Sequence, residues 1–113
     1  MLPKLNRLAS SIEISRVYKR GRRAKSANLS LFYFFSGQKI PSRFAFVVSK
    51  KQISRIVDRN RLKRILRSGV AGFRSRISPG YSVIVQGQPN MRRLESKKLV
   101  EELEDLLKKA RIL

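Results

Sequence analysis

Nine consecutive residues, 59–67, concentrate most of the recognisable chemistry of this chain. Five of them are arginine or lysine, and none is acidic. On a helix, where each residue turns by about 100°, three apolar side chains share one narrow arc, namely Leu62, Ile65 and Leu66. The opposite side is cationic and carries Arg59, Lys63, Arg64 and Arg67, with Asn60 between them and Arg61 at the margin. A helix with one apolar edge and one crowded cationic face predicts an anionic partner, and RNA or DNA is the first candidate.

A second group of cations, formed by Lys50, Lys51 and Arg55, directly precedes this helix. Backbone N–H groups at the start of a helix attract anions, and neighbouring cations strengthen that attraction. The sequence therefore predicts a site for a phosphate group at this position. The plain alternative is a solubilising loop that binds nothing.

The segment 29–35 (Leu-Ser-Leu-Phe-Tyr-Phe-Phe) is aromatic and predicts a strand. Alternation places Phe32 and Phe34 on one face of that strand. Together with Tyr18 on a preceding helix, these rings could stack on unpaired bases beside Arg22, Arg23 and Lys25. The alternative is that the rings are plain core, which periodicity alone favours.

The composition indicates one folded domain over residues 1–113, with a strong need for counter-charge. The chain has 27 basic and 7 acidic side chains, a formal net charge of +20, and 42% hydrophobic residues. That hydrophobic content is too high for a disordered basic tail. Residues 29–76 alone hold 12 basic residues and 1 acidic residue. Such self-repulsion opposes compaction unless a polyanion supplies the missing charge.

Several functions are excluded or disfavoured by what the sequence lacks. Without Cys or His, the chain has no disulfide, zinc finger, thiol nucleophile or imidazole base. Its seven carboxylates form no evident acid–base or metal-binding pair, and it has no glycine-rich phosphate loop. We expect no catalytic residue, no protein-bound metal or cofactor and no small-molecule substrate. We also expect a cytoplasmic location without a membrane partner, since no apolar run approaches the ~20 residues that span a bilayer.

The order of predicted elements indicates an α/β two-layer sandwich with a small mixed sheet. Helices are expected at 11–20, 55–70 (with an extension to about 77 open) and 95–111, and strands at 29–35, 43–48 and 81–85. The first helix begins with the Ser-x-x-Glu spacing of a capping box at 10–13, and residues 22–25 are expected to be a basic linker. The second strand, expected to run antiparallel to the first, forms a βαβ unit with the basic helix and the third strand. Such units are usually right-handed.

Four segments of the chain resemble the bacterial ribonuclease P protein component family. Residues 48–51 (Val-Ser-Lys-Lys) are followed, after seven residues, by 59–67 (Arg-Asn-Arg-Leu-Lys-Arg-Ile-Leu-Arg), which is close to the signature of that family. Residues 5–8 (Leu-Asn-Arg-Leu) and 17–21 (Val-Tyr-Lys-Arg-Gly) resemble its start and first helix. Size, charge and element order agree as well, so the resemblance covers nearly the whole chain.

The resemblance implies a function that the residues alone do not give. The family is the protein subunit of a ribonucleoprotein whose RNA performs catalysis. That complex removes the 5′ leader of precursor tRNA by phosphodiester hydrolysis, with Mg²⁺ expected in the RNA holoenzyme. The partners implied are the catalytic RNA and precursor tRNA. The family fold is of the type named after the second domain of a small-subunit ribosomal protein, and its βαβ crossover is left-handed, against the general rule.

The resemblance also assigns roles by position. The residues expected to face the catalytic RNA are Arg59, Asn60, Arg61, Lys63, Arg64 and Arg67, supported by Lys50, Lys51 and Arg55. The residues expected in a cleft for the leader are Tyr18, Phe32, Arg22 and Arg23. Ile14 stands where many family members have Phe.

Two other readings of the sequence remain open. One is a general RNA-binding structural protein, such as a small ribosomal protein. The other is a basic protein of a membrane surface or of compacted DNA.

Overall fold

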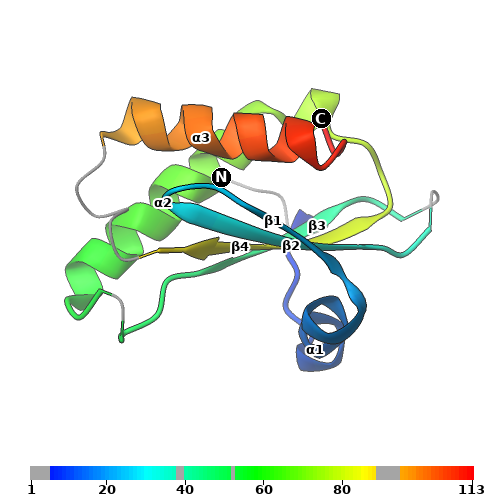
Figure 1. The fold of residues 1–113 in the computed structure, drawn as a ribbon, viewed down its shortest axis with the longest axis horizontal. Coiled ribbons are helices and arrows are strands. Elements are labelled where there is room, and N and C mark those ends of the chain that lie inside the picture. The colour runs from blue at the N-terminus through cyan, green and yellow to red at the C-terminus, as the bar shows by residue number, and fades with distance from the viewer. Residues whose placement is uncertain (1–5, 38–39, 52, 89–94) are drawn as a thin grey trace.

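A four-stranded sheet separates two unequal layers of helices in the computed structural model of the chain (Figure 1). The structure describes residues 6–37, 40–51, 53–88 and 95–113. In chain order the elements are α1 (Ser11–Arg20), β1 (Arg22–Lys25), β2 (Leu29–Phe35), β3 (Arg43–Val47), α2 (Ile56–Gly72), a 3-10 turn (Arg74–Arg76), β4 (Tyr81–Gly87) and α3 (Ser96–Lys109). The expected α/β sandwich with a mixed sheet is confirmed.

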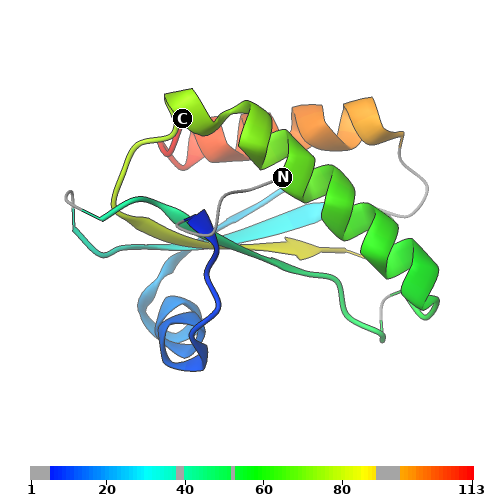
Figure 2. The same cartoon turned by 180° about the vertical axis from the view of Figure 1, so that it is seen from behind.

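The strand order is β1-β2-β4-β3. β4 therefore lies between β2 and β3, the two strands that the sequence predicted to precede it in the chain. β2 pairs antiparallel with both β1 and β4, while β3 pairs parallel with β4. α2 makes the connection between these parallel strands, which gives the expected βαβ unit. The handedness of this crossover stays a prediction. Figures 1 and 2 agree that α2 and α3 cover one face of the sheet and α1 lies against the other.

The two faces of the sheet carry two separate cores because successive strand residues point to opposite sides. The larger core lies beneath α2 and α3 and includes Leu31 and Val83 from the sheet. The smaller core, beneath α1, is formed by Leu8, Val17 and Ile84. Paired residues share a face, so the pair Phe32–Ile84 belongs to the α1 side and the pair Tyr33–Val83 to the other.

The helices agree closely with the sequence-based bounds, and two differences concern the end of α2 and the segment 22–25. α2 ends at Gly72 rather than continuing toward residue 77, and a 3-10 turn follows it. The segment 22–25 is the strand β1 and not a basic linker. Its side chains are mostly charged, yet its backbone pairs with Ser30–Tyr33 and only Ala24 needs burial. Edge strands of this kind carry little hydrophobic signal.

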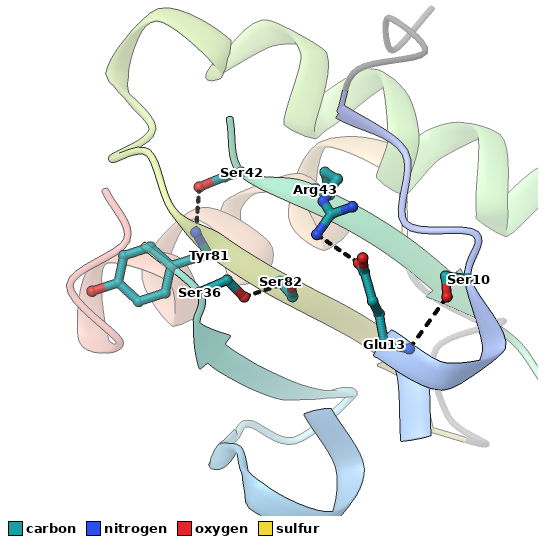
Figure 3. Close-up of polar contacts among 7 residues, drawn as sticks. All are labelled: Ser10, Glu13, Ser36, Ser42, Arg43, Tyr81 and Ser82. Atoms are coloured by element: carbon teal, nitrogen blue, oxygen red, sulfur yellow. Dashed lines mark hydrogen bonds and ion pairs between the residues drawn. The ribbon is translucent and has the colours of Figure 1, made fainter. Parts of the chain in front are cut away.

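Polar contacts fix α1 and the strand ends to the sheet (Figure 3). Ser10 Oγ accepts a hydrogen bond from the backbone N–H of Glu13 at 3.4 Å, which is half of the expected capping box. The Glu13 carboxylate does not return to the cap. It forms an ion pair with Arg43 at 2.6 Å instead, which ties α1 to β3. At the start of β4, the backbone N–H of Tyr81 donates to Ser42 Oγ at 3.0 Å.

Glu102 on α3 holds the turn between β1 and β2. Its carboxylate accepts hydrogen bonds from Ser26 Oγ, from the backbone N–H of Asn28 and from Asn28 Nδ2, at 2.5 to 2.8 Å. Two turn residues are thereby fixed to the helix that covers the larger core. Two residues further along α3, hydrogen bonds from Arg76 and Lys108 hold the pKa of Glu104 below its ordinary value.

Gly21 ends α1 at a point where the chain has no room for a side chain. Its backbone N–H donates to Val17 O at 2.9 Å. A Cβ at this position would overlap Val17 O and lie 2.7 Å from Tyr33 O. The tight join allows β1 to start directly after the helix.

We predict that Gly21→Ala lowers the free energy of unfolding by about 1–3 kcal/mol, the range for overpacked sites. Urea denaturation measures the change. Gly72→Ala is the matched control, because a Cβ there meets nothing within 4 Å and alanine in a helix is favoured by up to ~1 kcal/mol. Equal effects of the two substitutions would contradict this account of Gly21.

Candidate nucleic-acid interface

α2 presents the basic sequence 59–67 with its apolar side turned into the larger core. Leu62, Leu66 and Val70 are fully buried, and Ile65 packs against them from the margin. The helix lies against both α3 and β3. The expected division of the helix into an apolar edge and a cationic face is therefore present, but the cationic residues are not all equally exposed.

Asn60, Arg61 and Arg64 form the exposed centre of this face, so the expected place of Arg61 at its margin is wrong. Arg61 and Arg64 also line a shallow groove of about 450 Å³ between α2 and α3, together with Ile65, Ser68, Ser96 and Val100. Neither arginine pairs with a carboxylate among the described residues. Two unpaired guanidinium groups beside hydroxyl groups can bind phosphate oxygens through several hydrogen bonds.

Arg59 is oriented differently from the other basic residues of α2. Its Nη1 donates to the backbone carbonyls of Ile53 at 2.9 Å and Ser54 at 2.8 Å. Ile53 is itself buried in the larger core. Arg59 thus fixes the loop before the helix, and its expected contact with RNA stays a prediction.

Lys63 and Arg67 are half-buried on the flank of the cationic face. The guanidinium carbon of Arg67 lies 6.0 Å from the centre of the Phe46 ring on β3, within the range of a cation–π contact. This contact restrains the side chain, and a restrained side chain loses less entropy on binding any ligand. Phe46 is uncharged and lies on β3 rather than on α2, so the sequence pattern of the basic helix did not indicate its part in the site.

The start of α2 has the features of a phosphate site. Arg55 is the N-cap residue, and no side chain caps the helix there. Lys50, Lys51 and Arg55 are all exposed beside the first turn. Asp58 lies in that turn and pairs with Arg55 at 3.9 Å, a distance at which an exposed pair is weak. The first-turn amides and three cations therefore remain available to an anion.

A row of aromatic and polar side chains lies on the opposite face of the sheet, beside α1. The Tyr18 and Phe32 rings are 4.9 Å apart and inclined at 58°, and the Arg23 guanidinium carbon lies 5.3 Å from the Phe32 ring. Tyr18 Oη donates to Gln86 Oε1 at 3.2 Å. Burial raises the pKa of Tyr18, so its hydroxyl keeps the proton that it donates. We call Arg23, Phe32, Tyr18 and Gln86 the aromatic row.

Arg22 does not join this row, although it was expected in the same cleft. β1 pairs Arg22 with Tyr33 and Arg23 with Phe32, so the two arginines point to opposite faces of the sheet. The core alternative for the rings is partly right, because Phe32 and Phe34 pack with Ile14 on the smaller core. Tyr18, at 42% exposure, keeps much of its ring open to solvent.

Gln86 is the residue of the row that sequence reasoning missed. The predicted strand ended at residue 85, whereas β4 continues to Gly87. The available signal was alternation, because Gln86 shares a face with Ile84 once the strand is extended.

Five of the seven carboxylates lie at 95–105, on or just before α3, and all seven lie in the described part of the chain. Among the residues that the structure describes, no group of three or more acidic side chains is positioned to hold a metal ion. No described helix has both the length and the apolar character required to span a lipid bilayer.

The geometry is that of a small basic α/β protein with a cationic helix on one face of its sheet and an aromatic row on the other. The family model "Ribonuclease P" matches residues 2–111 of this chain. The chain belongs to the ribonuclease P protein family, and its role is that of the protein component of ribonuclease P.

Individual relatives agree over almost the whole length. The ribonuclease P protein component of Rippkaea orientalis is 34% identical, covering 99% of this chain and 91% of its own. That of Synechocystis is 33% identical, covering 99% and 90%. Among solved structures, a Staphylococcus aureus RNase P protein mutant matches with a TM-score of 0.89 at 24% identity, over 97% of this chain and 92% of its own. The Thermotoga maritima RNase P protein matches with a TM-score of 0.82 at 23% identity, over 91% and 96%.

We predict that the double substitution Arg61→Gln, Arg64→Gln reduces the salt dependence of RNA binding. Each phosphate contact contributes roughly 0.7–0.9 to the slope of log K against log salt, so the slope should fall by about 1–2. Fluorescence anisotropy with a structured RNA over a salt series measures it. Arg76→Gln is the control, because Arg76 is already paired with Glu104 at 2.9 Å. An equal loss of slope in the control would place the RNA elsewhere on the protein.

Proposed function

We propose that this chain holds the catalytic RNA of ribonuclease P on the cationic face of α2 and the 5′ leader of precursor tRNA along the aromatic row. In this role it supports endonucleolytic removal of the leader and supplies no catalytic group of its own. The residues proposed for the catalytic RNA are Asn60, Arg61, Lys63, Arg64 and Arg67, with Lys50, Lys51 and Arg55 at the start of the helix. The residues proposed for the leader are Tyr18, Phe32, Arg23 and Gln86.

The observation that carries this proposal is the placement of two different RNA-binding chemistries on opposite faces of one sheet. The α2 face offers cations and amides, which suit the phosphate backbone of a folded RNA. The α1 face offers ring surfaces, a guanidinium group and an amide, which suit unpaired bases. A protein that must hold a folded RNA and a single-stranded leader at once needs both.

The Mg²⁺ expected in the holoenzyme is assigned to the RNA in this proposal. Two carboxylates of the chain are paired with arginine at 2.6 and 2.9 Å, those of Glu13 and Glu104, and Glu102 is bound by the β1–β2 turn. Oxygen ligands for a divalent cation are therefore more plentiful on the phosphates that α2 contacts. The general RNA-binding structural protein remains a weaker alternative, because it does not account for the aromatic row beside the cationic helix.

We predict that the protein increases 5′ processing of precursor tRNA by a bacterial ribonuclease P RNA at low Mg²⁺. The cations of α2 should offset phosphate repulsion that Mg²⁺ otherwise screens. Gel analysis of the 5′ product with RNA alone and with added protein measures the increase. The Arg61→Gln, Arg64→Gln variant should restore less activity, and no increase with the wild-type chain would refute the proposed function.

We predict that Phe32→Leu together with Tyr18→Leu weakens holoenzyme binding to precursor tRNA by ~1–3 kcal/mol for each base that loses a stacking partner. Leucine preserves apolar packing on the smaller core while it removes the ring faces. Competition binding with precursor and with mature tRNA measures the effect, and mature tRNA should be unaffected. A lowered unfolding midpoint with equal losses for both RNAs would mean that the rings serve only the core.

A further inference from the structure

A second hollow, separate from the aromatic row and from the cationic face of α2, lies where α1 and α3 both end. Its volume is about 710 Å³. We call it the end pocket, and its lining residues are Arg20, Gly21, Arg22, Tyr33, Phe34, Phe35, Tyr81, Lys109, Ala110 and Arg111. Arg22, which the alternation of β1 removes from the aromatic row, is one of them.

The apolar part of the end pocket is an exposed aromatic surface at an open strand edge. Phe35 is 50% exposed, and its ring meets Tyr81 edge-on at 5.3 Å. Tyr33 lies 6.4 Å from the same tyrosine ring, whose position at the start of β4 is drawn in Figure 3. β1 pairs only with Ser30–Tyr33, so β2 runs past it and its edge is open at the next two residues. Ring faces beside unpaired backbone groups can stack on a base and hydrogen-bond to its edge.

The charged part of the end pocket is an uncompensated group of four cations, formed by Arg20, Arg22, Lys109 and Arg111. All four are exposed, and none of them pairs with a carboxylate in the part of the chain that the structure describes. The C-terminal ends of α1 and α3 each bring roughly half a negative charge. Four full positive charges exceed that sum, so the pocket attracts anions.

Arg111 occupies a left-handed backbone position at the end of α3, where glycine is the usual residue. It follows the C-cap of α3 with φ of 62°, while Ile112 N–H donates to Leu107 O at 2.9 Å and Arg111 N–H to Lys108 O at 3.0 Å. This is the hydrogen-bond pattern of a Schellman motif, whose left-handed position is usually glycine. Arginine at this position costs free energy. Its side chain adds a cation to the lining of the end pocket.

We infer that the end pocket binds an unpaired segment of RNA, with a base on Phe35 and Tyr81 and phosphates on the four cations. The inference rests on the proposed function, because that function brings two RNAs with single-stranded segments to this protein. The segment is either the distal part of the precursor leader or an unpaired strand of the catalytic RNA. The two sources share the chemistry that the pocket recognises, and binding experiments can separate them.

The test uses substitutions whose effects on RNA affinity and on stability differ between a pocket that binds RNA and one that serves only the fold. Arg111→Gly removes the left-handed arginine and should raise the unfolding midpoint, and combined with Lys109→Gln it should weaken RNA binding about fivefold or more. Arg111→Lys keeps the charge and should retain most of the affinity. Arg74→Gln removes an exposed charge outside the pocket and should change affinity less than twofold.

Two binding arms identify the source of the RNA. The first measures protein affinity for the catalytic RNA alone, and the second measures holoenzyme affinity for precursors with short and long leaders. A loss in the first arm assigns the pocket to the catalytic RNA, and a loss confined to long leaders assigns it to the leader. Unchanged affinity in both arms, with a normally binding wild-type protein, overturns the inference alone. Wild-type protein that binds neither RNA overturns the proposed function, and this inference falls with it.

A spectroscopic readout tests the stacking directly. The chain has no tryptophan, so Phe35→Trp places a single indole in the end pocket. Addition of a short single-stranded oligouridylate should change its fluorescence, and the change should be lost when Arg111→Gly and Lys109→Gln are added. Fluorescence that does not respond to the oligonucleotide, or that responds equally with the cations removed, contradicts the inference.

Discussion

The scarcity of carboxylates is the constraint on which the rest of this structure depends. Seven acidic side chains face 27 basic ones, so most cations cannot be neutralised within the protein. Three of the acidic groups join separate elements of the fold. Glu13 attaches α1 to β3, and Glu102 attaches the β1–β2 turn to α3. Glu104 joins α3 to the segment after α2 through Arg76. The remaining cations lie on outer surfaces, where a polyanion supplies the charge that the chain lacks.

The sheet converts this excess of charge into distinct surfaces. Because neighbouring residues on a strand point to opposite faces, Arg22 and Arg23 reach different environments although they are adjacent in sequence. Phe32 and Tyr33 are separated in the same way. Each surface therefore pairs cations with a different apolar neighbour: core-anchored helix residues on α2, a tyrosine–phenylalanine pair beside α1, and the Phe35 and Tyr81 rings at the end pocket. The two cores, one on each face of the sheet, hold the three surfaces apart.

The parts of the fold that could be predicted from the sequence are those with strong periodicity. α2, α3, β2 and β4 have apolar repeats that only one type of element satisfies, and their bounds agree to within a few residues. β1 could not be predicted, because an edge strand with one buried alanine lacks such a repeat. The cationic face of α2 was also predictable, but the diversion of Arg59 to the carbonyls of Ile53 and Ser54 depends on how the preceding loop closes. Phe46 joins the α2 site through the packing of β3 against the helix, which local patterns do not encode, and Gln86 was missed because the predicted strand ended one residue before it.

The central position of β4 determines when this chain can fold during its synthesis. Both β2 and β3 pair with it, so neither half of the sheet is complete until residues 81–87 have left the ribosome. At 5–20 residues per second, the interval between completion of β2 and completion of β4 is about 3–10 s. For the last part of that interval, about 1–4 s between synthesis of residue 67 and of residue 87, the cationic segment 55–67 is present on an open nascent chain, surrounded by ribosomal RNA. The order of the strands thus exposes this protein to a competing polyanion before its own structure can form.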